Sequence, residues 1–334
     1  MTAPTKPPRS RSTQPNSFRI ADRVATRLKL KQLRLLVAIA EHSSILHAAE
    51  SLAISQPTAT KLLKDLELDF GVTLFHRTNR GVVATPHGEV LVRHGKLILT
   101  QIANAALELD DLTEGSGGRV VVGTLLAASA ILLPDTIERL RAKRPNVAVV
   151  VREGTNDLLM PALRVGDVDL VVGRLPEYRH RDELVQEPLF DERIAVIARP
   201  GHPLVAKAAP NFADLAACEW ILPPPETTLR RQIEKEFRDH DQTPPSRVIE
   251  SVSYLTTSRL VRRSDMLCVW PYHVAKEAIE AGSLAEIPVS PCLKSSPVGV
   301  SYRRQGSLSP AAELFLDELR ATATDMQNSE NQTS

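Results

Sequence analysis

The sequence predicts an α/β protein with a helical head, one long linking helix and a two-lobed α/β domain. Three patterns indicate this fold class. Apolar residues recur at helical spacing between residues 28 and 70, and a heptad-like apolar period runs from Leu91 to Leu112. From residue 119 to 323, β-branched runs alternate with amphipathic segments. Because 334 residues exceed one ordinary domain, each pattern is assigned to its own part of the chain.

Composition excludes several classes of protein. Hydrophobic residues make up 43% and charged residues 24%, which is typical of soluble globular proteins. No apolar run approaches the ~18 residues of a membrane span, and the polar, proline-rich residues 1–17 lack the apolar core of a signal peptide. We therefore expect a cytoplasmic protein without membrane contact. Cys218, Cys268 and Cys292 are widely spaced and the nine histidines lack ligand spacing, so we expect no disulfide, metal or cofactor.

The net charge of +1 conceals a split along the chain. Residues 1–100 hold 15 Lys and Arg against 7 Asp and Glu, whereas residues 101–334 hold 26 against 33. A basic front half favours a polyanionic partner. Part of this charge has another explanation, since five of the 15 cations precede residue 25 in a leader, residues 1–26, that we expect to be disordered.

The head, residues 27–85, contains three predicted helices. The first runs from about Leu28 to His42, the second from Ile45 to Leu52, and the third from Gln56 to about Phe70. Ser44 and Ser55 are placed to cap the second and third helices, and Gly71 to end the third. The short second helix and the three-residue turn have the proportions of a helix-turn-helix, although any three-helix bundle needs similar packing.

The third helix favours DNA as the partner. Its Leu62, Leu63 and Leu66 can face the other helices, which leaves a polar face near the N-terminal end. Amide, hydroxyl and ammonium groups there suit the base edges of a major groove. The residues predicted to contact DNA on this helix are Ser55, Gln56, Pro57, Thr58, Thr60, Lys61 and Lys64.

A two-stranded wing is predicted after the third helix. Apolar residues 72–75 and 82–83 flank a basic turn that contains Arg77 and Arg80. Cations at the tip of a wing contact phosphates or enter the minor groove, so both arginines are predicted to bind DNA. An exposed charged hairpin without a DNA role is the alternative.

Residues 28–88 resemble the winged helix-turn-helix of LysR-type transcriptional regulators. The elements AAESL, SQPTAT, LELDFGV, LFHR and TPHG occur in the order and spacing of that family. The resemblance implies binding of double-stranded DNA at a pseudo-palindromic promoter site by a homodimer or homotetramer, with RNA polymerase as a further partner. Thr60 and Lys61 stand where many relatives carry Ser and Arg, which replaces a planar guanidinium by a point charge.

The linking helix, residues 86–114, begins at Pro86 after a capping Thr85. At 1.5 Å per residue it is a rod of roughly 40 Å. Its single apolar stripe favours pairing with a second copy of the same helix, and packing on the chain's own back domain is the alternative. The predicted dimerisation residues are Leu91, Ile98, Ile102, Ala105, Leu109 and Leu112. Residues 115–118 then form a glycine-rich joint.

The back domain, residues 119–324, alternates strands and helices. Strands at 119–126, 147–155 and 168–175 with helices at 131–145 and 156–167 predict a parallel, doubly wound sheet. The alternation continues far enough for a second lobe. The polar residues 325–334 are expected to form a disordered tail.

Ligands of such sheets bind at the carboxyl ends of strands, near helix N-termini. Hydroxyls and one cation occur there, which suits a small anion or a polyhydroxylated molecule. Thr155 and Ser253 could instead cap helices, and Arg174 could form a structural salt bridge. The predicted effector-binding residues are Ser129, Thr155, Arg174, Thr227 and Ser253.

The back domain also resembles the effector domain of LysR-type regulators, which is similar to periplasmic solute-binding proteins. The resemblance implies a first lobe of residues 119–190 and 295–324, a second lobe of residues 191–294, and an inducer between them. Residues 153–175 are similar to regulators of galactose-binding-protein and protocatechuate-pathway genes, which implies a carboxylate or sugar inducer. In aromatic-acid-responsive relatives, the positions of Thr155 and Arg174 lie near bound carboxylates, while Ala127 replaces a common hydroxyl.

These features predict an inducer-controlled, sequence-specific DNA-binding transcriptional regulator that is not an enzyme. An enzyme with a DNA-binding head is one alternative, but the sequence has no GxSxG, Walker, GxGxxG or HExxH motif. A solute-binding protein for transport is another, which the basic N-terminal helices disfavour.

Overall fold

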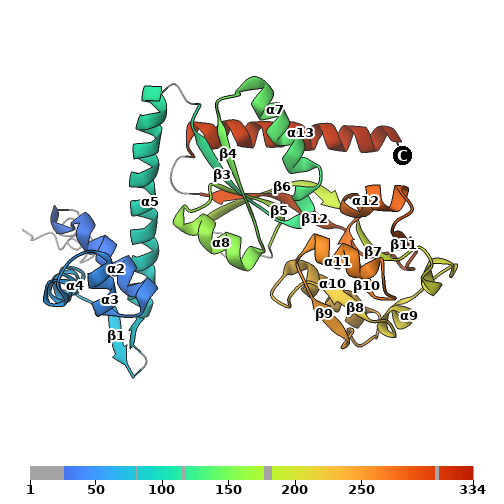
Figure 1. Ribbon diagram of the computed structural model, residues 1–334, viewed down its shortest axis with the longest axis horizontal. Helices are drawn as coiled ribbons and strands as arrows, with labels where there is room; N and C mark the ends of the chain where they lie inside the picture. The colour runs from blue at the N-terminus through green and yellow to red at the C-terminus, as the bar shows by residue number, and fades with distance from the viewer. Residues whose placement is uncertain (1–25, 80, 115–116, 177–182, 305–307, 334) are drawn as a thin grey trace, which may run out of the picture. The chain divides into compact units, whose positions relative to one another are not determined.

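The structure is a computed structural model that describes residues 26–79, 81–114, 117–176, 183–304 and 308–333 (Figure 1). The chain forms two compact units, which meet in sequence at Ala103 and Asn104. The leader expected over residues 1–25, and residues 115–116 of the expected joint, lie outside the described residues. Among the helices described, none combines the length and apolar character that crossing a membrane requires.

The first unit contains the three predicted helices, α2 (Leu30–His42), α3 (Ile45–Ser51) and α4 (Gln56–Phe70). Local capping sets their ends. The Ser44 hydroxyl accepts a hydrogen bond from the His47 amide and the Ser55 hydroxyl accepts one from the Thr58 amide, while Gly71 ends α4 at a φ of 71°. Small residues in α3 let the helices approach closely, because Ala48 and Ala49 are buried at the centre of the apolar core.

The predicted wing is the antiparallel pair β1 (Phe75–Thr78) and β2 (Gly81–Ala84). It is attached to the turn between α2 and α3, where the Val82 amide donates to the Ser43 carbonyl over 2.9 Å. A β-carbon on Gly81 would lie 2.5 Å from that same carbonyl oxygen, and Gly81 has a φ of 125°. The close approach therefore requires glycine at this position.

The long helix α5 (Pro86–Glu114) begins at the predicted cap. The Thr85 hydroxyl accepts a hydrogen bond from the Gly88 amide and donates to the Thr73 carbonyl. Two glycines of α5 differ in the space around them. A β-carbon on Gly88 would lie 2.0 Å from the Leu74 carbonyl oxygen, whereas one on Gly95 would meet side chains of α2 at 3.5–3.7 Å, which is ordinary contact.

Gly88→Ala is expected to lower the free energy of unfolding of the first unit by about 1–3 kcal/mol, because the methyl group overlaps backbone that cannot rotate away. Gly95→Ala is the matched control. It removes a helical glycine where the methyl group fits, and is expected to raise the free energy of unfolding by about 0.5–1 kcal/mol. Hydrogen–deuterium exchange over residues 26–103 of the full chain measures both effects. Equal shifts in the two variants would contradict the assigned contact at Gly88.

The second unit begins with a five-stranded sheet in the order β4-β3-β5-β12-β6. As predicted, β3 (Arg119–Thr124), β4 (Ala148–Glu153) and β5 (Leu170–Arg174) are parallel. The same sheet also contains an antiparallel strand, because β12 (Ser296–Arg303) is antiparallel to both β5 and β6 (Leu184–Glu192). The chain enters β12 on its return from the second lobe, and therefore runs against the strands that preceded it.

Helices cover this sheet. They are α6 (Leu126–Ser129), α7 (Leu132–Lys143), α8 (Asn156–Val165) and α13 (Pro310–Thr333). The expected helix at 131–145 is thus preceded by the short α6. Phe315 and Leu319 of α13 are buried in the core with residues of α7 and β3.

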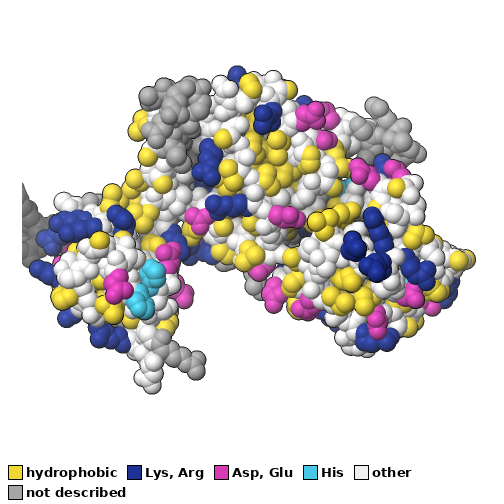
Figure 2. Space-filling model, in the orientation of Figure 1, with side chains coloured by type: hydrophobic (Ala, Val, Ile, Leu, Met, Phe, Trp, Pro, Cys, Tyr) yellow, Lys and Arg dark blue, Asp and Glu magenta, His cyan; other side chains and the backbone are white. Residues whose placement is uncertain are grey.

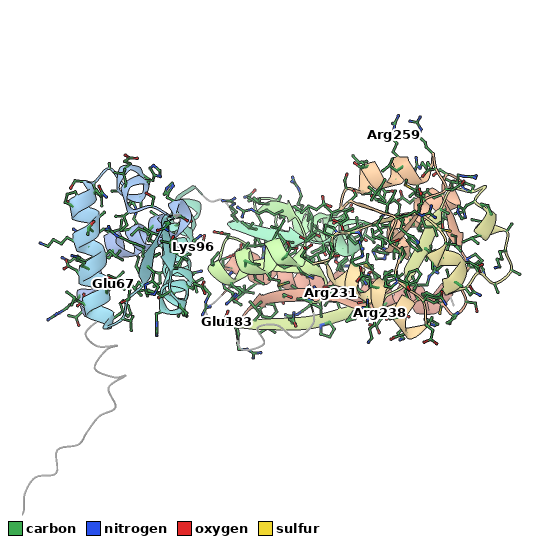
Figure 3. The ribbon with its side chains drawn as sticks, turned by 90° about the horizontal axis from the view of Figure 1, so that it is seen from below. Glu67, Lys96, Glu183, Arg231, Arg238 and Arg259 are labelled. Carbon is green, nitrogen blue, oxygen red and sulfur yellow. The ribbon has the colours of Figure 1, made fainter. Side chains whose placement is uncertain are left out.

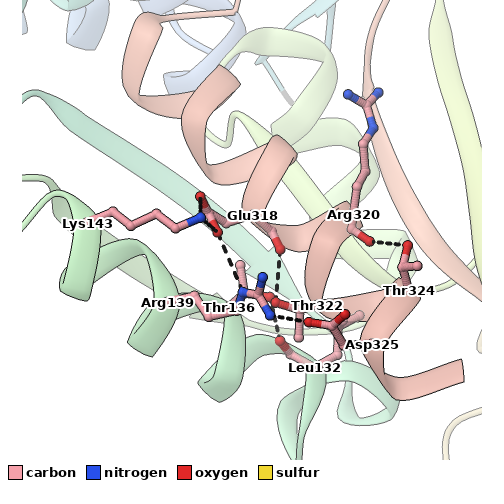
Figure 4. A network of polar contacts seen from close by, with 9 residues as sticks. All are labelled: Leu132, Thr136, Arg139, Lys143, Glu318, Arg320, Thr322, Thr324 and Asp325. Atoms are coloured by element: carbon pink, nitrogen blue, oxygen red, sulfur yellow. Dashed lines mark hydrogen bonds and ion pairs between the residues drawn. The ribbon is translucent and has the colours of Figure 1, made fainter. Parts of the chain in front are cut away.

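The disordered tail expected from residue 325 is corrected by the structure, in which α13 continues to Thr333. No proline or glycine follows Pro310 to end the helix. Polar contacts also hold its later turns. Asp325 pairs with Arg139 of α7 (Figure 4). The Gln327 amide donates to the Leu189 carbonyl over 2.7 Å. Seven residues before Asp325, Glu318 of α13 pairs with Lys143 of α7 at 2.7 Å.

The second lobe has the sheet order β11-β7-β10-β8-β9. The chain passes from the first sheet to the second at Arg193, close to the lobe boundary expected at residues 190–191. The core contains Trp220 and Phe237, whose rings meet edge to face. The strands are β7 (Ile194–Ala198), β8 (Trp220–Leu222), β9 (Val248–Glu250), β10 (Leu267–Pro271) and β11 (Ala285–Ile287). The helices are η1 (Pro203–Val205), α9 (Phe212–Ala216), α10 (Thr228–Asp239), α11 (Tyr254–Val261) and α12 (Tyr272–Glu280).

Candidate DNA-binding surface and effector cavity

Helix α4 presents a polar face to solvent. Leu63 and Leu66 are buried against α2 and α3, as predicted, together with Ala59, while the predicted Leu62 is partly buried there. The other side carries exposed Gln56, Pro57, Thr58, Lys61 and Lys64, and half-buried Thr60. The Ser55 and Thr58 hydroxyls lie 2.8 Å apart and serve the cap of the helix. The N-terminal turns of α4 therefore expose an amide, a hydroxyl and two ammonium groups in a row that base edges could meet.

The wing adds a cation to this surface. Arg77 is exposed on β1, opposite Val82 of β2. Arg80 lies outside the described residues. Figure 2 shows Lys and Arg side chains on the surface of the first unit, around the α4 end. Because these cations are exposed, they are available to contact the phosphates of DNA.

The predicted dimerisation stripe of α5 divides into two parts. Ile98, Ile102 and Leu109 are 41%, 46% and 66% exposed, and Ala105 is exposed as well. Leu91 differs from these residues, because it is half-buried against the core of its own helix-turn-helix unit. The period alone could not distinguish these neighbours. The side chain of Leu112 lies outside the described residues.

A cavity of about 500 Å³ lies between the two lobes of the second unit. Four of the five predicted effector residues line it: Thr155, Arg174, Thr227 and Ser253. Ser129 does not. Its hydroxyl donates to the Leu125 carbonyl over 3.1 Å, because the last turn of α6 directs it back toward its own helix. The lining also includes Asn156, Thr228 and Tyr254, at the helix N-termini where the sequence predicts ligand binding, and Thr257 and Trp270, which the sequence analysis missed. The first three directly follow predicted residues.

The capping alternative holds for some of these hydroxyls and not for others. The Ser253 hydroxyl accepts a hydrogen bond from the Thr256 amide and so caps α11. Thr227 caps α10 and donates to the Pro224 carbonyl over 2.8 Å. Thr155 precedes α8 without a side-chain capping bond, which leaves its hydroxyl available to a ligand.

Arg174 forms the structural salt bridge that was the alternative to ligand binding. Its side chain is 4% exposed and pairs with Glu192, whose side chain is fully buried at the end of β6. A second guanidinium nitrogen, Nη1, donates to Gln232 Oε1 over 2.8 Å. Burial raises the pKa of the Glu192 carboxyl, and Arg174 opposes that rise. The cation of the cavity is therefore already neutralised by a carboxylate.

Side-chain hydrogen bonds join the lobes around the cavity. Besides the Arg174–Gln232 bond, Asn156 Nδ2 donates to Thr228 Oγ1 over 3.4 Å, and His273 Nε2 lies 2.7 Å from the Ala127 carbonyl oxygen. Within the first lobe, Asn156 Nδ2 also donates to the Arg174 carbonyl over 3.1 Å. Asn156 Oδ1 is buried without a hydrogen-bond partner among the described residues, so a donor on a bound molecule would complete the site.

The cavity wall also has an aromatic part. The rings of Tyr254 and Trp270 pack with centroids 4.8 Å apart, and both side chains line the cavity. Leu125, Leu126 and Val269 add further apolar surface to the lining. Such a site suits a small molecule with one apolar face and several polar groups.

Comparison with known proteins identifies both units. Residues 30–89 match the family described as bacterial regulatory helix-turn-helix protein, lysR family, and residues 113–324 match the LysR substrate binding domain. The transcriptional regulator GbpR of Azospirillum brasilense is 36% identical over 89% of this chain and 87% of its own length. The transcriptional regulator PcaQ of Agrobacterium fabrum is 30% identical over 91% of this chain and 97% of its own length.

Solved structures show the same fold. The LysR-family regulator CbnR in complex with its target DNA is 21% identical and has a TM-score of 0.60, with 88% of this chain and 100% of CbnR covered. The sequence matches extend over both units. The helix-turn-helix of the first unit and the two-lobed α/β domain of the second agree with the two family descriptions. The chain therefore belongs to the LysR family of DNA-binding transcriptional regulators, which carry a small-molecule-binding domain.

Proposed function

We propose that two copies of this chain bind a pseudo-palindromic promoter site, each with α4 in a major groove. Gln56, Thr60 and Lys61 face base edges, while Lys64 and the wing arginines contact phosphates. The exposed polar face of α4, opposite buried Ala59 and Leu63, is the observation that supports this assignment most strongly. Ser55 and Thr58 position the first turn of the helix.

The cavity between the lobes binds the inducer in this proposal. A neutral polyhydroxylated molecule fits better than a carboxylate, because Glu192 already neutralises Arg174. The Thr155 hydroxyl and the Asn156 amide bind its polar groups, and Tyr254 and Trp270 contact its apolar face. Thr227 and Ser253 also line the cavity, and both residues cap helices. Monosaccharides are thus expected to raise the unfolding temperature of the full chain more than aromatic carboxylic acids do.

Regulation follows if the inducer has different affinities for two arrangements of the lobes, because only such a ligand shifts their equilibrium. The exposed stripe Ile98, Ile102, Ala105 and Leu109 pairs two chains, and pairs of dimers assemble into a tetramer on longer sites. The altered complex then acts on RNA polymerase at the promoter, in the cytoplasm where the chromosome lies.

Lys61→Ala tests the DNA assignment. The variant is expected to lose about 1–3 kcal/mol of specific binding free energy, because it loses a donor to base edges. Lys276→Ala is the matched control, since it removes the same charge from an exposed position on α12 in the other unit. Binding is measured by mobility shift at fixed salt, on genomic fragments selected by the wild-type protein. Equal affinities of the two variants would refute the assignment.

A further inference from the structure

A second cavity of about 910 Å³ lies in the same unit, apart from the helix-turn-helix surface and next to the effector cavity. One wall is a face of α10, and the opposite wall comes from β6 and from the chain on both sides of β12. Both lobes therefore contribute to it. We call this cavity the anion groove, for the charges described next.

The lining of the anion groove is strongly basic. Arg231, Lys235 and Arg238 are spaced four and three residues apart on α10, which places them on one face of the helix. Lys294 and Arg304 also line the groove, from the segments before and after β12. Figure 3 shows Arg231 and Arg238 close together along α10. Among the described residues of the lining, these five cations are accompanied by one acid, Glu236, which is 3% exposed.

The three cations of α10 are poorly neutralised, whereas Lys294 pairs with Asp239 over 3.3 Å and lies 3.9 Å from a Glu236 oxygen. The Arg231 guanidinium donates to the Glu226 backbone carbonyl rather than to an acid, and Lys235 has no ion pair among the described residues. Arg238 lies 3.8 Å from a Glu234 carboxylate oxygen. By contrast, Lys143 and Lys207 elsewhere in the unit lie 2.7 and 2.6 Å from their acids. A concave surface with uncompensated charge of one sign concentrates ions of the other sign.

The walls of the groove are held in place before any ligand binds. Gln232 Nε2 donates to the Lys294 carbonyl over 2.8 Å, which fixes the segment before β12 against α10. The same side chain accepts the hydrogen bond from Arg174 described above. A site that is already ordered loses less conformational entropy on binding.

We propose that the anion groove binds a small molecule with two or more anionic groups, either phosphates or carboxylates. The cations come from three separate segments, so a ligand must carry charges at more than one end to engage them. Guanidinium forks bind phosphate and carboxylate oxygens in the same bidentate geometry, and the volume is that of a metabolite-sized pocket. This site is a second cavity beside the inducer cavity, and Thr228 lines both.

Isothermal titration of the full chain with pyrophosphate, and separately with citrate, tests the proposal at constant ionic strength. Lys235→Gln with Arg238→Gln is expected to weaken binding by at least about tenfold. The control, Arg259→Gln with Arg262→Gln, removes the same charge from exposed positions at α11, and Figure 3 places Arg259 at a different edge of the unit. The control variant is expected to bind as the wild type does.

The two probes also distinguish the source of the charge. Binding of pyrophosphate alone identifies a phosphorylated ligand, binding of citrate alone identifies a polycarboxylate, and binding of both supports the shared chemistry. The proposal is overturned if neither probe binds the wild type in the millimolar range or tighter. It is equally overturned if the Lys235/Arg238 variant binds both probes with wild-type affinity.

Discussion

Arg174→Met is expected to lower the free energy of unfolding of the effector-binding unit by about 3–5 kcal/mol at neutral pH. The substitution leaves Glu192 as a buried carboxylate without its cation, and the side chain of Glu192 is fully buried. His273 does not replace Arg174 as the partner of Glu192, because His273 Nε2 lies 3.7 Å from Glu192 Oε1 and already contacts the Ala127 carbonyl. Urea unfolding followed by tryptophan fluorescence reports this unit, since both tryptophans, Trp220 and Trp270, belong to it.

The double variant Arg174→Met, Glu192→Gln is the control. Removing both charges leaves no uncompensated buried ion, so most of the lost stability is expected to return. If the double variant is as unstable as Arg174→Met, the loss comes from packing around residue 174 and the charge explanation is wrong.

The deficit of Arg174→Met is also expected to depend on pH. Burial raises the pKa of Glu192 above its ordinary value of 4.5, and removing the opposing Arg174 raises it further. Below that raised pKa the folded variant holds a proton that the unfolded chain has released. Stability of the variant therefore rises as the pH falls toward 4.5, and the deficit is largest above the folded-state pKa. A deficit that is constant between pH 8 and pH 5 would contradict this cause.

Ile98→Glu combined with Ile102→Glu is expected to convert the assembled protein into monomers at micromolar concentration. The two side chains are 41% and 46% exposed on α5, and a carboxylate in a helix seam would lose its hydration without gaining a partner. Because each half-site then binds alone, affinity for a two-half-site DNA is expected to fall by about two orders of magnitude or more. Sedimentation velocity gives the state of assembly, and mobility shift gives the affinity.

Ala103→Glu supplies the comparison for this seam. Residue 103 is exposed, and at about 100° per residue it lies away from the stripe formed by Ile98 and Ile102. It adds a charge to the same helix without entering the seam, and we expect the assembly to persist. Should the Ile98/Ile102 variant sediment as the wild type does, the chains associate through another surface.

Local signals made the helix-turn-helix predictable from the sequence. Ser44, Ser55 and Gly71 act on the backbone within four residues of themselves, so the bounds of α3 and α4 follow from the neighbouring letters. The same holds for Thr85 at the start of α5. Sequence spacing also identified Leu63 and Leu66 as inward-facing and Lys61 as outward-facing.

Contacts between distant segments were not predictable in this way. The direction of β12 depends on how the chain returns from the second lobe, and the neighbour of Leu91 depends on where α2 packs. Glu192 is 18 residues from Arg174 on another strand, so its charge could not be assigned to that cation in advance. The anion groove gathers residues between 175 and 304, and no single stretch of sequence has that basic character.

The contact between α4 and base edges is tested most directly by dimethyl sulfate footprinting of the wild type and of Gln56→Ala with Lys61→Ala, at protein concentrations that saturate the DNA. Dimethyl sulfate reports the major-groove N7 atom of guanine, which recognition side chains cover. We expect the wild type to protect guanines in two half-sites about one helical turn apart, or a multiple of that spacing. The double variant should lose that protection. An unchanged pattern in the double variant would show that these side chains do not lie against the bases.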